Sequence, residues 1–139
     1  MMEYIERLKV DSDQANPFFK MMGVSVLSFT DGHAELSMEI LPEMHNGVGW
    51  LQGGLFVALA DEAMALALYT VLAGNEGIAT ISESTSFLRG AREGTLFARG
   101  WVIRRGRRVA FTEAEVRRGG GSGEVLARTT ASFAIVSKT

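Results

Sequence analysis

The sequence predicts an α+β protein in which a curved antiparallel sheet wraps around one long central helix. The segments expected to be strands and helix follow the order β-β-α-β-β-β-β along the chain. The helical segment is apolar on nearly every side, so other elements must surround it. The β-α-β-α alternation that is typical of a parallel sheet is absent, which favours the antiparallel arrangement.

The N-terminal segment is expected to be a short helical lead-in. Residues 2–9 show brief helical periodicity. The segment NPFFKMMG indicates a second short helix that Pro17 starts and Gly23 stops, because proline suits the first helical position and glycine the end of a helix.

A β-hairpin is predicted next, formed by VSVLSFT (24–30) and HAELSMEI (33–40). The two segments flank Asp31-Gly32, a dipeptide that tolerates the positive φ angles of a tight turn.

The long helix is predicted from about Gly53 to Ala73, a segment rich in Ala, Leu and Met and longer than an ordinary strand. It should end near Gly74-Asn75, because both residues are good left-handed caps. Further strands are expected after it, separated by Arg/Gly turns and by a flexible GGGSG segment, at residues 77–88, 95–105, 109–118 and 124–136.

Length and composition indicate a single globular domain over residues 1–139. Hydrophobic residues make up 47% and the net charge is only −2, so neither disorder nor a bulk affinity for nucleic acid is expected. The chain has no cysteine and its N-terminus lacks an apolar signal region, which is compatible with a cytoplasmic protein. The apolar tract 51–73 carries Asp61 and Glu62 at its centre, so it indicates a buried helix and no membrane contact.

Charge is distributed unevenly along the chain. Residues 1–88 carry 3 basic and 12 acidic side chains, whereas residues 89–139 carry 11 basic and 4 acidic ones. Arginine dominates the basic half, and its planar guanidinium suits phosphate. A solvated sheet face that pairs with the acidic half would have the same composition.

Several functional motifs are absent. GVGWLQGG has the glycine content of a nucleotide-binding loop but not its spacing, and no G-x-S-x-G nucleophile elbow occurs. Two histidines without H-x-x-x-H spacing, and no cysteine, supply too few ligands for a metal site. No metal site and no dinucleotide-binding loop are therefore expected.

The start of the long helix is more informative. Two glycines there cost stability, so bare backbone should serve a purpose, and the unpaired N–H groups of a helix N-terminus suit a thioester carbonyl or an oxyanion. The alternative is that Gly53-Gly54 merely makes the turn into the helix. Helical spacing places Gly54, Ala58, Asp61 and Ala65 on one stripe, which leaves room beside the acid.

Two interpretations of Asp61 remain open, and its neighbour Glu62 is expected to point elsewhere. Asp61 is either a functional carboxylate or a paired buried acid that holds subunits together. Glu62 should point about 100° away, toward solvent or toward an arginine across an interface.

The pattern N-x-x-G-x-x-x-G-G-x-x-x-x-L-A-D resembles that of the hotdog-fold acyl-CoA thioesterases, specifically the phenylacetic-acid-degradation (PaaI-like) branch. It is formed by Asn46, Gly49, Gly53, Gly54, Leu59, Ala60 and Asp61. NPFFKMMGVSV, TSFLRGAREGTLFARG and RRGRRVAFTEAEV also occur in the expected order, so the resemblance covers most of the chain.

The resemblance implies a hotdog domain, a homo-oligomer built as a dimer of dimers with sites between subunits, and hydrolysis of an acyl-CoA with an aryl or medium-chain acyl group, without metal or cofactor. By position, Asp61 is the general base or nucleophile, the Gly53 N–H polarises the thioester carbonyl, and Asn46 orients water or the acyl group. Substrate and CoA contacts are implied for Gly54, Arg89, Gly90, Gly106, Arg107 and Arg108.

One departure concerns Gln52, which stands where most members of this branch have histidine. Glutamine can hydrogen-bond the thioester oxygen or orient a neighbour but cannot titrate near neutrality. Two alternatives remain: a non-catalytic module that binds acyl-CoA or an acyl carrier, and a hotdog hydratase or dehydratase, whose sites pair a histidine with an acid.

Overall fold

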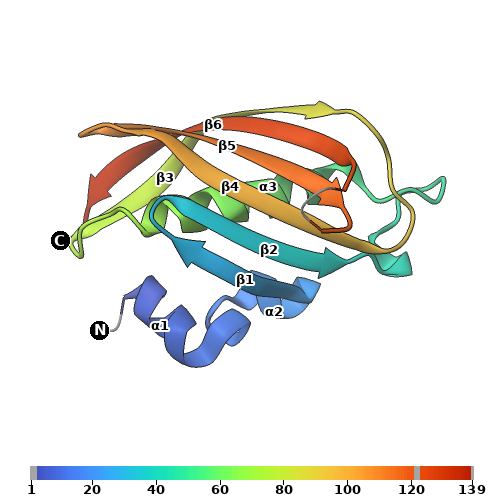
Figure 1. Cartoon of the computed structure of the whole chain (residues 1–139), viewed down its shortest axis with the longest axis horizontal. Coiled ribbons are helices and arrows are strands. Elements are labelled where there is room, and N and C mark those ends of the chain that lie inside the picture. The colour runs from blue at the N-terminus through green and yellow to red at the C-terminus, as the bar shows by residue number, and fades with distance from the viewer. Residues whose placement is uncertain (1–2, 121–122, 139) are drawn as a thin grey trace.

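The computed structural model describes residues 3–120 and 123–138, and within them the strands form one antiparallel sheet. The strand order is β1-β2-β4-β5-β6-β3, so β1 and β3 are the two edges (Figure 1). The elements in chain order are α1 (Tyr4–Asp11), the 3-10 turn η1 (Ser12–Ala15), α2 (Pro17–Met22), β1 (Val24–Thr30), β2 (His33–Glu39), the 3-10 turn η2 (Pro42–Met44), α3 (Gly53–Tyr69), β3 (Glu76–Phe87), β4 (Thr95–Arg105), β5 (Val109–Arg118) and β6 (Val125–Ser137). The predicted α+β class, a curved antiparallel sheet around a long helix, is confirmed.

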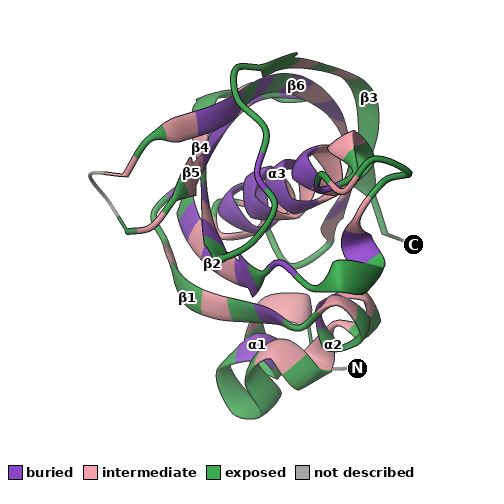
Figure 2. Cartoon of the chain, turned by 90° about the vertical axis from the view of Figure 1, so that its right-hand side faces the viewer, coloured by how far each residue is buried: buried purple, intermediate pink, exposed green. Residues whose placement is uncertain are grey.

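The core lies between α3 and the concave face of the sheet, where Figure 2 shows the buried residues of the helix. α3 packs mainly on β4, β5 and β2. The closest approach is at Gly100 of β4, where an added Cβ would lie 2.5 Å from the carbonyl carbon of Ala63. Only glycine allows the helix backbone to sit this close to the sheet.

The open side of α3 departs from the expectation that the helix is surrounded. Gly54, Ala58, Asp61 and Ala65 are all at least partly exposed. The reason is that α3 makes few contacts with the edge strand β3. One stripe of an otherwise apolar helix therefore stays accessible in a single chain.

The β1–β2 hairpin forms as predicted. Asp31 and Gly32 adopt φ angles of 48° and 80°, the left-handed conformations that the tight turn requires.

The end of α3 differs from the prediction by about one turn, because the helix stops at Tyr69 rather than near Ala73. The Thr70 hydroxyl donates to the Ala67 carbonyl at 2.6 Å and accepts from the Gly32 N–H at 2.7 Å. Thr70 thereby connects the helix end to the β1–β2 turn. The predicted cap residues, Gly74 and Asn75, give no indication of this tertiary contact. In the described part of the chain no helix is long and apolar enough to cross a membrane.

The N-terminal lead-in forms α1 and α2, which lie beside β1 (Figure 1). Asn16 caps α2 by accepting from the Phe18 and Phe19 N–H groups, and Gly23 ends it with a φ of 69°. The predicted start and stop are both confirmed. Of the segment GGGSG, expected to be flexible, residues 121–122 lie outside the described residues.

Candidate active site

The N-terminus of α3 is capped by Gln52. The Gln52 side-chain oxygen accepts a hydrogen bond from the Gly54 N–H. A Cβ at Gly54 would lie 2.7 Å from that oxygen, so any side chain at position 54 would displace the cap. The second glycine therefore leaves room for a helix cap that satisfies one of the otherwise unpaired N–H groups.

The neighbouring Gly53 N–H remains free, since no acceptor for it occurs within residues 3–120 and 123–138. A free N–H at the positive end of a helix dipole attracts a negatively charged oxygen. The Phe87 ring lies 3.5 Å from where a Cβ on Gly53 would stand, and it meets Phe56 edge-on with ring centroids 6.2 Å apart. The free donor thus lies beside two aromatic rings.

Asp61 lies on the open side of α3, partly exposed between the small residues of its stripe. The Thr80 hydroxyl of β3 donates a hydrogen bond to Asp61 Oδ1 at 3.5 Å. The carboxylate therefore faces the edge strand, at a place where helix and sheet make few contacts.

A bulge in β3 turns both Thr80 and Glu83 toward α3. In a regular strand, residues 80 and 83 would face opposite sides of the sheet. The register shifts just after Thr80, which pairs with Phe133, whereas Glu83 pairs with Ala131. Phe133 and Ala131 are two residues apart on β6 and both face the core. The side chain of Ile81, at the bulge, is 56% exposed.

Glu83 thereby joins Asp61 in a carboxyl pair, with the two groups within hydrogen-bonding reach. Glu83 Oε1 is buried and has no partner among the described residues. Burial, then the hydrogen bond to Asp61 and its charge, raise the pKa of Glu83 to about 8. Glu83 therefore carries a proton at neutral pH. Sequence reasoning missed this residue because strict strand alternation gives no sign of the bulge.

Glu62 turns toward the N-terminal lead-in, so within the chain its partner is an asparagine, in place of the expected solvent or an arginine across an interface. Asn16 donates to Glu62 Oε2 at 3.4 Å and to the Tyr4 hydroxyl at 2.7 Å. These residues line a cavity of about 490 Å³. Burial, then the Asp61 charge, raise the pKa of Glu62 to about 7, whereas the Asn16 hydrogen bond lowers it. The two neighbouring acids thus occupy different environments.

Asn46 closes the loop that precedes α3. Its side-chain oxygen accepts from the Val48 and Trp50 N–H groups at 3.0 and 3.1 Å. No hydrogen bond joins its side chain to Gly53 or Asp61 within the described residues. Asn46 therefore shapes the loop in a single chain.

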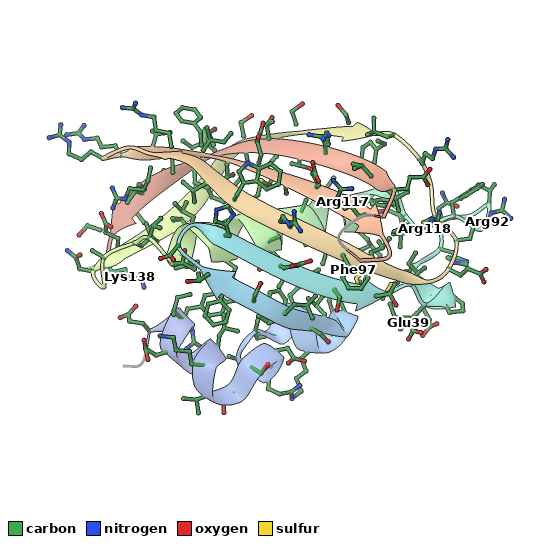
Figure 3. All side chains as sticks on the ribbon, in the orientation of Figure 1. Glu39, Arg92, Phe97, Arg117, Arg118 and Lys138 are labelled. Atoms are coloured by element: carbon green, nitrogen blue, oxygen red, sulfur yellow. The ribbon has the colours of Figure 1, made fainter. Side chains whose placement is uncertain are left out.

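One group of the residues expected to contact CoA lies near the start of α3. Arg89, which makes an exposed ion pair, and Gly90 follow β3 directly. Arg118 donates to the Gly90 carbonyl at 3.2 Å, and the Arg92 guanidinium stacks 4.0 Å above the Trp50 ring. Figure 3 shows Arg92 and Arg118 at one end of the molecule, with Lys138 at the other.

The second group, Gly106, Arg107 and Arg108, forms the turn between β4 and β5, and both arginines are exposed. β4 contains 11 residues, which at about 3.3 Å per residue separates the two groups by roughly 35 Å. One chain therefore cannot bring both groups to the same phosphate.

The two histidines lie away from Asp61. His45 Nε2 is 2.7 Å from the Arg92 carbonyl, and His33 lies with Trp101 on the outer face of the sheet. Within a single chain, this arrangement does not pair a histidine with Asp61. No group of His, Cys, Asp and Glu suited to a metal ion occurs within residues 3–120 and 123–138.

A family model described as the thioesterase superfamily matches residues 49–125, more than half of the chain, including Gly53, Asp61 and Glu83. The chain belongs to the thioesterase superfamily. It is also 34% identical over 116 residues, 82% of this chain and 75% of the other, to a Deinococcus radiodurans protein whose name provisionally calls it an esterase.

Solved structures show the same fold. A thioesterase family protein from Silicibacter pomeroyi aligns with a TM-score of 0.85 at 21% identity, over 97% of this chain and 99% of that one. A phenylacetic acid degradation-related protein from Ralstonia eutropha JMP134 aligns with a TM-score of 0.83 at 26% identity, over 95% and 99%. The predicted hotdog fold and the predicted enzyme class, a thioester hydrolase, are confirmed by membership of this superfamily.

Proposed function

We propose that this thioesterase-superfamily member hydrolyses an acyl-CoA with an aryl or medium-chain acyl group to the free acid and CoA. The observation that carries the proposal is the open side of α3, where a carboxylate and a free helix N–H are both accessible beside β3. The Phe87 and Phe56 rings beside Gly53 favour an apolar or aromatic acyl group over a short polar one.

In the proposed reaction, Asp61 acts as general base. A water oxygen attacks the thioester carbonyl carbon while the Asp61 carboxylate takes the water proton, and the Gly53 N–H stabilises the oxyanion that forms. Collapse of the tetrahedral intermediate breaks the C–S bond. The departing thiolate then takes up the proton held by Asp61, which restores the carboxylate.

A second role for Asp61 is direct attack on the carbonyl carbon, which would give an acid anhydride that water then hydrolyses. A single turnover in ¹⁸O-labelled water separates the two roles. Label in the Asp61 carboxylate supports the nucleophile, because water has then attacked the Asp61 carbonyl of the anhydride. Label only in the acid product is expected for the general base, provided that hydroxylamine traps no acylated Asp61, since water attack at the acyl carbon of an anhydride would label the acid as well.

The proposed site needs two subunits. Gly53 and Asp61 are 8 residues apart on α3, which is about 12 Å along the helix at 1.5 Å per residue, too far for one carbonyl group to meet both. Two copies with antiparallel α3 helices would place Asp61 of one subunit beside Gly53 of the other. The unpaired edge of β3, with Ile81 and Phe87 more than half exposed, offers a surface for such contact.

We therefore propose a homo-oligomer, arranged as a dimer of dimers. Light scattering at micromolar concentration should give a mass at least twice that of the chain. A stable monomer that still hydrolyses acyl-CoA would contradict the shared site.

The deciding experiment is a thiol-release assay on one aryl-CoA and one medium-chain acyl-CoA, with Asp61→Asn and its neighbour Glu62→Gln. Asp61→Asn keeps the shape but removes the base, so kcat should fall at least about 100-fold with binding nearly unchanged. Glu62 faces the lead-in, so Glu62→Gln should change kcat only slightly. A wild type that binds acyl-CoA without releasing thiol would indicate a binding module instead.

A further inference from the structure

We propose that Glu83 is a positioning residue of this site: in its protonated form it donates a hydrogen bond to the Asp61 carboxylate and holds that carboxylate toward the attacking water. This inference rests on the proposed role of Asp61 as general base. It assigns a task to a carboxyl group that lies outside the pattern N-x-x-G-x-x-x-G-G-x-x-x-x-L-A-D.

The inward position of Glu83 depends on the bulge in β3 just after Thr80. The bulge removes one regular ladder position and leaves Ile81 exposed on the edge strand. It brings Thr80 and Glu83 to the same face of an edge strand, opposite one carboxylate on α3. Asp61 thus faces two side chains of β3, the Thr80 hydroxyl that donates to it and the Glu83 carboxyl group.

The protonation state of Glu83 follows from its surroundings. Oε1 is buried without a donor in the described part of the chain, which is costly for an ionised carboxylate and tolerable for a neutral carboxyl group. The contact with Asp61 is a second condition that favours the neutral form of Glu83, since two carboxyl groups in contact cannot both ionise without strong repulsion. A neutral Glu83 satisfies both conditions and turns a repulsion into a hydrogen bond.

The charged groups around Glu83 leave Asp61 as its sole electrostatic partner in the described residues. Glu62, the next acid on α3, is bonded to Asn16 on another side of the helix. Arg128 of β6 pairs with Glu115 on the outer face of the sheet. The remaining residues that share the inner face with Glu83 are uncharged: Thr80 and Thr85 on β3, and Thr129, Ala131 and Phe133 on β6.

Deprotonation of Glu83 should therefore disturb the site in two ways. The donor is lost, because an ionised carboxylate only accepts hydrogen bonds, and the new charge repels Asp61. Activity should fall on the alkaline side as the pair loses its shared proton, and the apparent pKa of this fall belongs to the pair.

The test is the pH profile of kcat/KM from pH 5 to pH 10 for wild type, Glu83→Gln and Glu83→Ala, with Glu62→Gln as the matched control. The amide introduced by Glu83→Gln keeps an N–H donor but cannot titrate, so activity at pH 7 should stay within about threefold and the alkaline fall should disappear. Glu83→Ala should lower kcat about tenfold at every pH with little change in KM, the effect of losing one hydrogen bond to a charged group. Glu62→Gln should keep the alkaline fall.

An unchanged alkaline fall in Glu83→Gln would overturn the proposal. A readout independent of turnover is the ¹³C NMR titration of glutamate carboxyl groups. In the Glu62→Gln background, which removes the other glutamate with a raised pKa, one resonance should titrate near pH 8, be missing after Glu83→Gln and move to lower pH after Asp61→Asn. A Glu83 resonance that titrates near pH 4.5 would also overturn it. If instead Asp61→Asn hydrolysed acyl-CoA like wild type, the proposed role of Asp61 as general base would fail, whatever Glu83 does. A wild type that releases no thiol would overturn the proposed function itself.

Discussion

Gln52 caps α3 by accepting the Gly54 N–H, at the position where the resemblance implies histidine in most members of the branch. The sequence left open whether this side chain meets the thioester oxygen or a neighbour. In a single chain its oxygen is bound to the helix backbone, which leaves the Gly53 N–H as the free donor. Gln52 therefore fixes the conformation of the helix start.

Gln52→Ala should lower stability and activity together. Loss of the cap should reduce the free energy of unfolding by about 1 kcal/mol, measured by urea denaturation. kcat/KM should fall about 10-fold to 100-fold because the Gly53 N–H is less well fixed. Gln52→Ser, which restores a capping oxygen, should recover stability, and Gln52→His should remain active. Full activity in Gln52→Ala would show that the cap has no part in the reaction.

Glu62 should make the protein less stable as the pH rises. Its pKa is raised from 4.5 to about 7 in the folded chain, so its contribution to stability is fully present below pH 4.5 and is lost as the pH rises to about 7. The loss is on the order of 3 kcal/mol. Glu62→Gln should match wild type at pH 4.5 and be more stable at pH 8.5 in urea denaturation. The exposed Glu93→Gln serves as control, and a Glu62→Gln curve parallel to wild type would contradict the argument.

The two groups of arginines should bind CoA through its phosphates. Arg89→Ala, or the double replacement of Arg107 and Arg108, should raise KM for acyl-CoA about tenfold, because charge-assisted contacts to phosphate are strong. A short thioester without the nucleotide should show no change. Since the groups lie roughly 35 Å apart along β4, an effect from both would indicate that different subunits contribute to one CoA. Arg99→Ala is the control, and equal effects on both substrates would favour a solvated face.

Gly100→Ala should destabilise the fold strongly. The new Cβ would stand 2.5 Å from the carbonyl carbon of Ala63, and helix backbone cannot yield as a flexible side chain does. Displacement of α3 should cost about 3 kcal/mol or more of unfolding free energy. Gly74→Ala, where an added Cβ meets nothing within 4 Å, should be close to wild type. Comparable stability of the two variants would show that α3 shifts without cost.

Local signals determined the fold class and the position of its long helix. Asp31-Gly32 sets the hairpin because few other dipeptides tolerate two positive φ angles. Pro17 and Gly23 bound α2 for equally local reasons. The apolar composition of α3, interrupted by Asp61, placed a carboxylate on a helix that had to be packed inside the sheet. These features depend on the backbone preferences of single residues and on hydrophobic periodicity. Both are properties of residues that are close together in the sequence.

The tertiary structure decided which groups surround that carboxylate. The pairing of Glu62 with Asn16 joins residues 46 positions apart in sequence, and Thr70 ends α3 through a contact with the β1–β2 turn. The inward turn of Glu83 depends on a register shift against β6 that no alternation pattern contains. Each of these outcomes is set by long-range packing, where one extra residue in a strand reverses the face of every side chain after it.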